Sequence, residues 1–468
     1  MDFEKLIQSR SSFCREVAST LWGYAETAFK EYRSCQYLCE ILEKEGFHIT
    51  KSPAGVETAF IAEYGQGSPV VALLAEYDAL PKLSQQVSVT HKPLKEGGSG
   101  HGCGHNMLGT ASLAAALAVK DAIVSGEAQG TVRLYGTPAE ELLLGKVMLV
   151  KGGVFDGVDV ALGWHPERYN ALLESTFTAV NAVKFHYHGR TAHAAIDPYN
   201  GRSALDAVEL LNVSANYLRE HVPKTVSLHY STLCDGLAPN VVPENATAWY
   251  FVRGANRREV DSVYQRLRRC AFAAAEMTDT TCTEEFLGGC SDYMPNRTLE
   301  GVLWNQMKES SLPTYTEEEK SFIAQISQGM EDAIQGGWDT VQEEFGRDVT
   351  GDLICDFWCP PSAIRRGKVI AGSMDIGDVS HILPTAQFSI ACYGYGVVGH
   401  SWRITAYAGS SVGYKGMLKA AEIMAKATVA LFHSPETVAK AKEEFRAASK
   451  TPYVSPLPDG FRYDSDMA

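Results

Sequence analysis

The sequence has no long uninterrupted apolar run and no excess of positive charge. No stretch approaches the roughly 20 uninterrupted apolar residues of a membrane span. The first thirty residues carry charges throughout and lack the continuous apolar segment of a secretory signal. The net charge of −14 argues against nucleic acid or an anionic membrane as a partner, because either would repel the average surface. We therefore expect a cytoplasmic protein that binds neither nucleic acid nor membrane.

The chain also lacks a pattern of paired cysteines and any internal repeat. Its eleven cysteines are scattered over 468 residues. An odd number in a chain of this size fits reduced thiols better than a disulfide framework. No fixed period or low-complexity tract indicates a solenoid. The length exceeds one ordinary hydrophobic core, so we expect two domains or one core with a large insertion.

Short apolar runs alternate with helical patterns in the parts of the chain on either side of its middle. Four runs are typical of buried strands: 70–74, 132–135, 158–162 and 388–393. The long alanine-rich segment 106–124 lies between the first two and predicts a helix. This order predicts an α/β domain with a mostly parallel sheet.

The middle of the chain has a different pattern. Strand-like segments and two amphipathic helical segments between about 176 and 290 predict a small, mostly antiparallel sheet with two helices on one face. We therefore expect an α+β, ferredoxin-like domain at 176–290, inserted between catalytic parts at 1–175 and 291–468. The polar stretch 311–370 predicts a helical excursion that caps or shapes a site.

The stretch "GSGHGCGH" places His101, Cys103 and His105 on alternate positions with glycines between them. On an extended segment alternate side chains point the same way, and glycines leave room for an approaching group. The simplest group of that kind is a metal ion.

Further candidate ligands follow the predicted strands, at Asp78, Glu140, Glu141, His165 and His400. The carboxyl ends of parallel strands meet at one edge of the sheet, so these residues can share a site. Thiolate, imidazole and carboxylate together suit zinc, with manganese, iron or cobalt possible when carboxylates bridge two ions. Five of these residues are candidate metal ligands: Cys103, His105, Glu141, His165 and His400. One tetrahedral ion needs fewer ligands, so two divalent ions are expected.

Each of these residues alone has an ordinary structural explanation. His165 could be a hydrogen-bonded structural histidine, Cys103 a buried inert thiol, and Asp78 the cap of a turn. Only their combination predicts a site. If Glu141 binds metal, the adjacent Glu140 points elsewhere and can take a proton from a metal-bound water and pass it to a leaving amine. Amide hydrolysis would follow.

Six motifs together resemble one known family: "GHGCGHNMLG", "GTPAEE", "GWHP", "GRTAHAA", "NVVPENATAWYFVR" and "GSMDIGDVSH". They are similar to motifs of the dinuclear metallo-amidohydrolases that include aminoacylase, folate-cleaving glutamate carboxypeptidase and plant auxin-conjugate hydrolases. Within that family the likeness is greatest to the branch that holds the B subunits of the p-aminobenzoyl-glutamate hydrolases. It spans nearly the whole chain.

The resemblance implies a role for each of ten residues. Cys103, His105, Glu141, His165 and His400 correspond to metal ligands, Glu140 to the general base, and Asp78 to an aspartate that supports a metal-binding histidine. His193 corresponds to a histidine that stabilises the oxyanion, in dimeric members from the partner chain. Asn240 and Arg253 correspond to positions that hold the substrate's carbonyl or carboxylate. The alternative for Arg253 is a surface arginine on a strand.

Two positions depart from the family pattern. Many relatives have a metal-binding histidine two residues before the aspartate, but Glu76 stands there, as expected for the branch that uses Cys103 instead. Asn106 stands where most of that branch has aspartate, although the B-type relatives share the asparagine.

The leading hypothesis is a metal-dependent amidohydrolase that cleaves the amide bond of an N-acyl or N-aroyl amino acid, with two manganese or zinc ions per chain. Two alternatives remain: a dipeptidase or other small-amide hydrolase with the same metal site, and a non-catalytic partner subunit of a heteromeric hydrolase. We expect a homodimer, or a heterodimer with a homologous subunit, in which the inserted domain forms the dimer surface and a lid.

Overall fold

The chain folds into two units. The computed structural model describes residues 1–235 and 238–463. The first unit comprises Met1–Ser175, Met294–Lys368 and Val379–Tyr453, and the second comprises Thr176–Tyr293, Val369–Asp378 and the described residues 454–463. Two short segments far from the insertion in sequence therefore pack with the second unit, which the sequence pattern does not indicate.

A seven-stranded sheet forms the centre of the first unit. Its order is β1-β2-β4-β3-β5-β13-β6, and the neighbours β4, β3, β5 and β13 run parallel. The strands are β1 (His48–Lys51), β2 (Phe60–Gly65), β3 (Val70–Ala75), β4 (Thr131–Gly136), β5 (Val160–Glu167), β6 (Ala171–Leu172) and β13 (Thr385–Ala391). The predicted mostly parallel sheet is confirmed, with antiparallel strands added at both edges.

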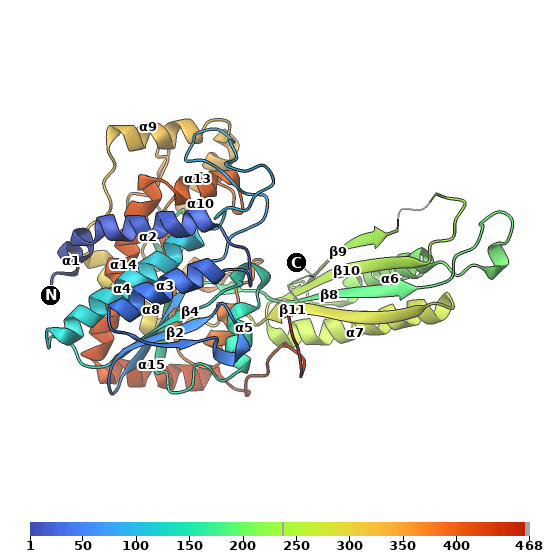
Figure 1. Cartoon of the computed structure of the whole chain (residues 1–468), viewed down its shortest axis with the longest axis horizontal. Helices are drawn as coiled ribbons and strands as arrows, with labels where there is room; N and C mark the ends of the chain where they lie inside the picture. The colour runs from blue at the N-terminus through green and yellow to red at the C-terminus, as the bar shows by residue number, and fades with distance from the viewer. Residues whose placement is uncertain (236–237, 464–468) are drawn as a thin grey trace. The chain divides into compact units, whose positions relative to one another are not determined.

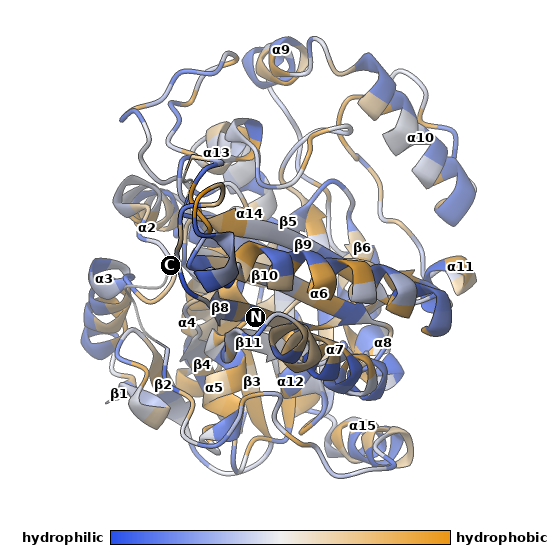
Figure 2. Ribbon diagram, turned by 90° about the vertical axis from the view of Figure 1, so that its right-hand side faces the viewer, coloured by the Kyte–Doolittle hydropathy of each residue, from blue (hydrophilic) through white to orange (hydrophobic). Residues whose placement is uncertain are grey.

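Helix α4 (His105–Val124) connects β3 to β4 and lies in the core. It packs on β3, β4 and β5 and beside α14 (Ser411–Phe432) and α2 (Ser11–Tyr24), as Figure 1 shows for α2. The sequence alone predicts no membrane span, but α4 is long and apolar enough to cross a membrane. Within the fold, however, 78% of its most apolar stretch is buried. Close packing explains its composition, because alanines let it approach the sheet and α14 on several sides. Figure 2 shows the apolar colouring of the strands it covers.

Further helices surround this core. They are α1 (Phe3–Ser9), α2 (Ser11–Tyr24), α3 (Tyr32–Lys44), α5 (Gly145–Lys151), α8 (Arg297–Glu309), α9 (Glu317–Ile326), α10 (Glu331–Phe345), α11 (Ala363–Arg366), α13 (Trp402–Ala408) and α15 (Pro435–Ala448). The stretch 311–370 contains the helices α9, α10 and α11, separated by irregular segments, and Ile323, Ile334 and Val341 bury their side chains in the core of the first unit. Its role in shaping a site stays a prediction.

The second unit has the element order β8, α6, β9, β10, α7, β11, which is the ferredoxin-like order. Its strands pair antiparallel in the order β11-β8-β10-β9. They are β8 (Ala179–His188), β9 (Ser227–Cys234), β10 (Asn245–Gly254) and β11 (Thr281–Cys290), and the helices are α6 (Ala204–Leu218) and α7 (Arg257–Met277). The predicted α+β architecture is confirmed.

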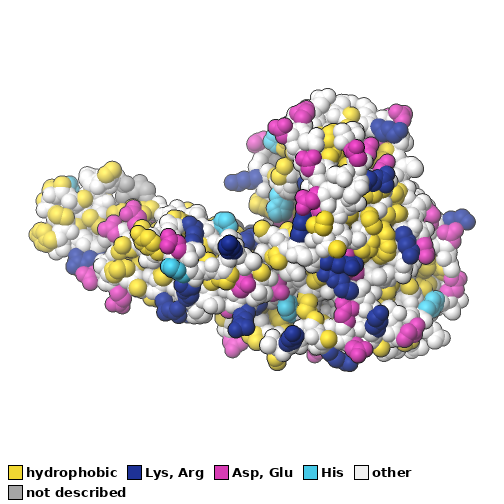
Figure 3. All heavy atoms as spheres, turned by 180° about the vertical axis from the view of Figure 1, so that it is seen from behind, with side chains coloured by type: hydrophobic (Ala, Val, Ile, Leu, Met, Phe, Trp, Pro, Cys, Tyr) yellow, Lys and Arg dark blue, Asp and Glu magenta, His cyan; other side chains and the backbone are white. Residues whose placement is uncertain are grey.

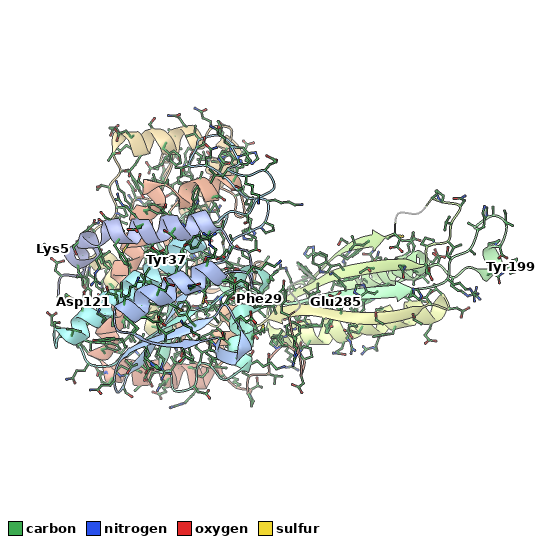
Figure 4. The ribbon with its side chains drawn as sticks, in the orientation of Figure 1. Lys5, Phe29, Tyr37, Asp121, Tyr199 and Glu285 are labelled. Carbon is green, nitrogen blue, oxygen red and sulfur yellow. The ribbon has the colours of Figure 1, made fainter. Side chains whose placement is uncertain are left out.

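The two faces of this four-stranded sheet differ. Apolar side chains such as Phe185, Leu211 and Leu267 form a core of their own with α6 and α7. The opposite face carries charged side chains such as Glu285, which is labelled in Figure 4. The carboxylate of Glu285 pairs with His186 at 2.7 Å. Two short elements complete the unit: β7 (Thr176–Phe177) pairs with β12 (Val369–Ile370). Helix α12 (Ile376–Ser380) leads from there back to the first unit.

Acidic and basic side chains are interspersed on the face seen in Figure 3. Neither sign of charge forms a continuous patch there.

Candidate metal centre

A cluster of thiol, imidazole and carboxylate groups lies in the first unit, at the carboxyl ends of β3, β4 and β5 and the start of α4. It consists of three overlapping groups, and within each the ligand atoms lie within 4.8 Å of one another. They are Cys103 with His105 and His165, Cys103 with Glu141 and His400, and His105 with Glu76 and Glu140. All five predicted metal ligands are therefore brought together. Their role as ligands stays a prediction.

Gly104 lets the chain turn sharply between two of these residues. It has φ +84° and precedes the first residue of α4, His105. A Cβ at Gly104 would lie 2.9 Å from Cγ of Pro166, so this position requires glycine for both its conformation and its space. The turn places Cys103 and His105 in one group.

The imidazole of His105 is oriented by Asp78. Its Nδ1 lies 2.8 Å from Oδ1 of Asp78, and Oδ2 of the same carboxylate accepts the backbone N–H of Glu141 at 2.9 Å. Burial raises the pKa of Asp78, but the positive charge and the hydrogen bond of His105 lower it by a larger amount. The net shift of the Asp78 pKa is therefore downward. An Nδ1–H that donates to Asp78 leaves the lone pair of Nε2 directed into the cluster.

The two glutamates after β4 sit in a strained turn. The short helix η2 (Glu140–Leu142) is flanked by Ala139 and Leu143, both with φ +57°. The backbone N–H of Ala139 donates to Oε1 of the buried Glu31 at 2.9 Å, which helps to hold the turn. Consecutive side chains consequently join different groups: Glu141 lies with Cys103, while Oε2 of Glu140 lies 3.9 Å from Nε2 of His105.

Two histidines complete the cluster. Nδ1 of His165 lies 2.9 Å from the carbonyl of Pro166, and its Nε2 lies 3.5 Å from Sγ of Cys103. His165 lies within β5, opposite Ser389, and not after the strand as expected from the sequence. His400 has φ +53°, and its Nε2 lies 3.3 Å from Oε2 of Glu141. Both rings therefore present Nε2 to the cluster.

The electrostatics of the cluster suit a cation. Burial and the negative charges of Asp78 and Glu76, opposed by the charge of His105, together raise the pKa of Glu141 to about 7. Burial also raises the pKa of Cys103 and lowers that of His165. Among the described residues, buried atoms without a hydrogen-bond partner include Oε1 of Glu141 and Nε2 of His105. A divalent metal ion fits this set, because it would satisfy the unpaired acceptors and stabilise their charged forms.

Comparison with known proteins agrees with this geometry. The sequence pattern of peptidase family M20/M25/M40 matches residues 72–459. The chain belongs to peptidase family M20/M25/M40. It is 38% identical over 454 residues to the B subunit of p-aminobenzoyl-glutamate hydrolase from Escherichia coli (strain K12), covering 95% of this chain and 94% of that protein.

Two more distant likenesses extend the comparison. The chain is 28% identical to the Xaa-Arg dipeptidase of Mus musculus, covering 92% of this chain and 88% of the dipeptidase. Its fold is similar to that of a dinuclear metal binding peptidase of the M20 family from Bacillus subtilis, with a TM-score of 0.59, 16% identity, and 91% and 99% of the two chains covered. As a member of the M20/M25/M40 family, the chain is a metal-dependent amide-bond hydrolase.

Three predicted residues of this M20/M25/M40 hydrolase lie in the second unit. His193 forms a β-bridge with Val241, and the backbone N–H of Ala194 donates to the carbonyl of Asn240 at 2.9 Å, so His193 and Asn240 lie on adjoining segments. Arg253, on β10, donates from Nη1 to Oγ of Ser373 at 2.6 Å. Their roles toward a substrate stay predictions.

His101 does not take part in the cluster, so the prediction that three alternating side chains point the same way is wrong. Its Nε2 lies 3.1 Å from the carbonyl of Leu21, and its Nδ1 accepts the backbone N–H of Asn106. The chain is not extended here, because the N–H of Gly104 donates back to the carbonyl of His101. Burial lowers the pKa of His101 to about 4.

Asn106 has a structural role at the start of α4. Its Nδ2 donates to the carbonyls of Ala18 and Ala408, at 3.1 and 2.9 Å. The side chain therefore ties α4 to α2 and α13, and the departure from aspartate at this position leaves the bond between His105 and Asp78 intact.

Proposed function

We propose that this M20/M25/M40 hydrolase cleaves the amide bond of an N-acyl or N-aroyl amino acid, with p-aminobenzoyl-glutamate as the first candidate substrate. The observation that carries the proposal is the convergence of Cys103, His105, Glu141, His165 and His400, with Glu140 beside them. The substrate class follows from the name of the Escherichia coli relative, which matches this chain over almost its full length.

Two divalent ions are proposed, and the residues that would hold them meet at Cys103. This thiol belongs to two groups of potential ligands, one completed by His105 and His165 and the other by Glu141 and His400. Sulfur, nitrogen and oxygen ligands together support zinc or manganese. When bound, the ions supply Lewis-acid polarisation of the substrate carbonyl and lower the pKa of a coordinated water.

The protein residues would then manage the proton and the charge of the transition state. Glu140 takes the proton of the attacking water and delivers it to the nitrogen of the leaving amino acid, since it is a buried carboxylate beside the cluster with no other assigned ligand role. Asp78 keeps His105 in the required tautomer. His193 and Asn240 are proposed to steady the oxyanion, and Arg253 to pair with a substrate carboxylate.

A second candidate function is a dipeptidase activity, favoured by the likeness to the Xaa-Arg dipeptidase. Metal content should be measured on the purified chain after chelator treatment and remetallation. A panel containing p-aminobenzoyl-glutamate, N-acyl amino acids and dipeptides ending in arginine, assayed with manganese or zinc, separates the candidates. About two ions per chain and release of a free amino acid would support the proposal. A chain that binds no ion and cleaves nothing would refute it.

Glu140→Gln tests the assigned proton transfer. We expect turnover to fall by more than about 10²-fold with metal content unchanged, as for removal of a general acid/base. Glu96→Gln, which changes an exposed glutamate, serves as the control. Nearly normal turnover of Glu140→Gln would contradict the role.

The partner is proposed to be a homologous chain, either a second copy or a different subunit. The second arrangement is supported by the name of the Escherichia coli relative, which marks that protein as one of the subunits of a hydrolase. Light scattering and activity of the purified chain alone distinguish the two, because an accessory subunit would be inactive until its partner is added. We also propose a cytoplasmic location, which the scattered and odd-numbered cysteines support.

A further inference from the structure

Glu76 is a deeply buried carboxylate at the edge of the metal cluster. It is the first residue after β3 and is only 2% exposed. Alternate residues of an extended chain point the same way, so Glu76 and Asp78 both face the cluster while Tyr77 points to the opposite side and donates to the carbonyl of Thr58. Many relatives have a metal-binding histidine at this position, but the family resemblance assigns no role to a glutamate there.

One oxygen of Glu76 pairs with a buried lysine. Oε1 lies 2.6 Å from Nζ of Lys146, whose side chain is fully buried near the start of α5. A buried ammonium or carboxylate is rare unless it is paired, because removing either from water is costly. The ion pair fixes the orientation of the carboxylate and leaves its other oxygen directed toward His105.

The second oxygen of Glu76 has no hydrogen-bond donor among the described residues. Oε2 lies 3.4 Å from Nε2 of His105, and each of these two atoms is buried without a hydrogen-bond partner. Nδ1 of His105 is already engaged by Asp78 at 2.8 Å. Two buried acceptors that face each other without a donor require a cation or a shared proton between or beside them.

The backbone of Glu76 is also held in place. A Cβ at Gly109 of α4 would lie 2.6 Å from the carbonyl oxygen of Glu76, so the helix backbone approaches the end of β3 as closely as glycine permits. The carboxylate is therefore fixed at both ends, by α4 at its backbone and by Lys146 at Oε1. Such rigidity suits a group that must present one oxygen to an ion.

We infer that Oε2 of Glu76 is an additional metal ligand that shares an ion with Nε2 of His105, and that Lys146 is the positioning residue that holds the other carboxylate oxygen. Oε2 of Glu140 belongs to the same group of atoms. The inference rests on the proposed metal-dependent function, and it adds a ligand to the five proposed from the family resemblance. The positive charge of Lys146 offsets the added carboxylate, so the pair contributes a ligand without adding net charge.

Metal binding by the full-length protein tests this inference. Chelator-treated protein is titrated with Zn²⁺ and with Co²⁺ in competition with a chromophoric chelator, with bound metal measured by elemental analysis. The variants are Glu76→Gln and the double variant Glu76→Gln/Lys146→Met, which removes both charges and so avoids an unpaired buried lysine. Glu422→Gln is the control, because Glu422 is a buried glutamate that pairs with Lys419 in α14, outside the cluster.

We expect both Glu76 variants to weaken the binding of one ion by more than about 100-fold. That loss exceeds the 10- to 100-fold typical when a residue that only orients a ligand is removed. The second ion should bind as in the unaltered protein, and the Co²⁺ absorption spectrum should change for one site only. Glu422→Gln should bind both ions normally. Thermal unfolding of each metal-free variant establishes that it is folded.

Other outcomes would overturn the inference. If a folded Glu76 variant binds both ions within about threefold of the unaltered protein, or more tightly, Glu76 is only the ion-pair partner of Lys146 and a proton acceptor for His105. If Glu76→Gln loses an ion that the double variant retains, the loss comes from the unpaired lysine. If the unaltered protein itself binds no ion, the proposed function fails. This outcome differs from a failure of the Glu76 inference, because it is seen in the unaltered protein and not in the variants.

Discussion

Replacing Asp78 by asparagine keeps the shape of the side chain but removes one of the acceptors on which the cluster depends. Asp78 accepts two N–H groups, from Nδ1 of His105 at 2.8 Å and from the backbone of Glu141 at 2.9 Å. Asparagine has one acceptor oxygen, and its NH₂ group would face the second donor. Either the ring of His105 or the turn that carries Glu141 must therefore lose its hydrogen bond.

The expected loss of metal affinity follows from the two residues, His105 and Glu141, that Asp78 holds by hydrogen bonds. Residues that orient a metal ligand through a hydrogen bond are worth about 10- to 100-fold in metal affinity. This corresponds to about 1.4 to 2.8 kcal/mol, at about 1.4 kcal/mol for each factor of ten. Since Asp78 holds two residues of the cluster, we expect the upper half of this range for Asp78→Asn, together with lower turnover at limiting metal.

The assay is chelator competition at fixed pH, with the turnover measured at saturating metal. Asp121→Asn is the matched control, because it makes the same substitution outside the cluster. Asp121 lies in α4 (labelled in Figure 4), and its carboxylate pairs with Arg10 at a distance of 2.7 Å. The control should bind metal normally. An affinity of Asp78→Asn within about threefold of the unaltered protein would refute the reasoning, as would an equal loss in both variants.

Two further predictions concern stability. Because burial lowers the pKa of His101 to about 4, from an ordinary value near 6.5, the unfolded chain binds the extra proton first as the pH falls. The contribution of His101 to stability is therefore complete above pH 6.5 and decreases by up to about 3 kcal/mol as the pH falls to about 4. Urea unfolding between pH 7 and 4 should show a shallower pH dependence for His101→Gln, and equal slopes would contradict this. Gly104→Ala should lower the free energy of unfolding by more than Gly97→Ala. Both glycines have positive φ, but only Gly104 has Pro166 within 2.9 Å of the added Cβ. Equal losses in chemical unfolding would exclude the steric contribution.

The sequence predicts the architecture of both units because their patterns are local. The apolar run at β3 and the long alanine-rich segment at α4 identify a βαβ unit, and the ends of its strands indicate where ligands gather. Cys103 and His105 could thus be placed together from the sequence alone. The error at His101 arose because alternation implies a common direction only in an extended chain, whereas Gly104 turns the chain at φ +84°.

The contacts of Glu76 with Lys146 could not be predicted from the sequence. Seventy residues separate the two side chains, and neither spacing nor hydropathy states which buried groups meet after folding. The signal available was weak: Lys146 directly precedes the apolar run 147–150 of α5, and a lysine buried there requires a partner. The support of the Ala139 turn by Glu31 likewise depends on tertiary packing.

The place of β13 in the sheet has a consequence for synthesis of the chain on the ribosome. β13 lies between β5 and β6, although more than two hundred residues, including most of the second unit, are translated between β5 and β13. Until those residues emerge, β5 presents an open apolar edge, and the cluster around Cys103 lacks His400. The nascent first unit must therefore remain soluble with an unfinished sheet, and metal loading with the full set of ligands becomes possible only late in translation.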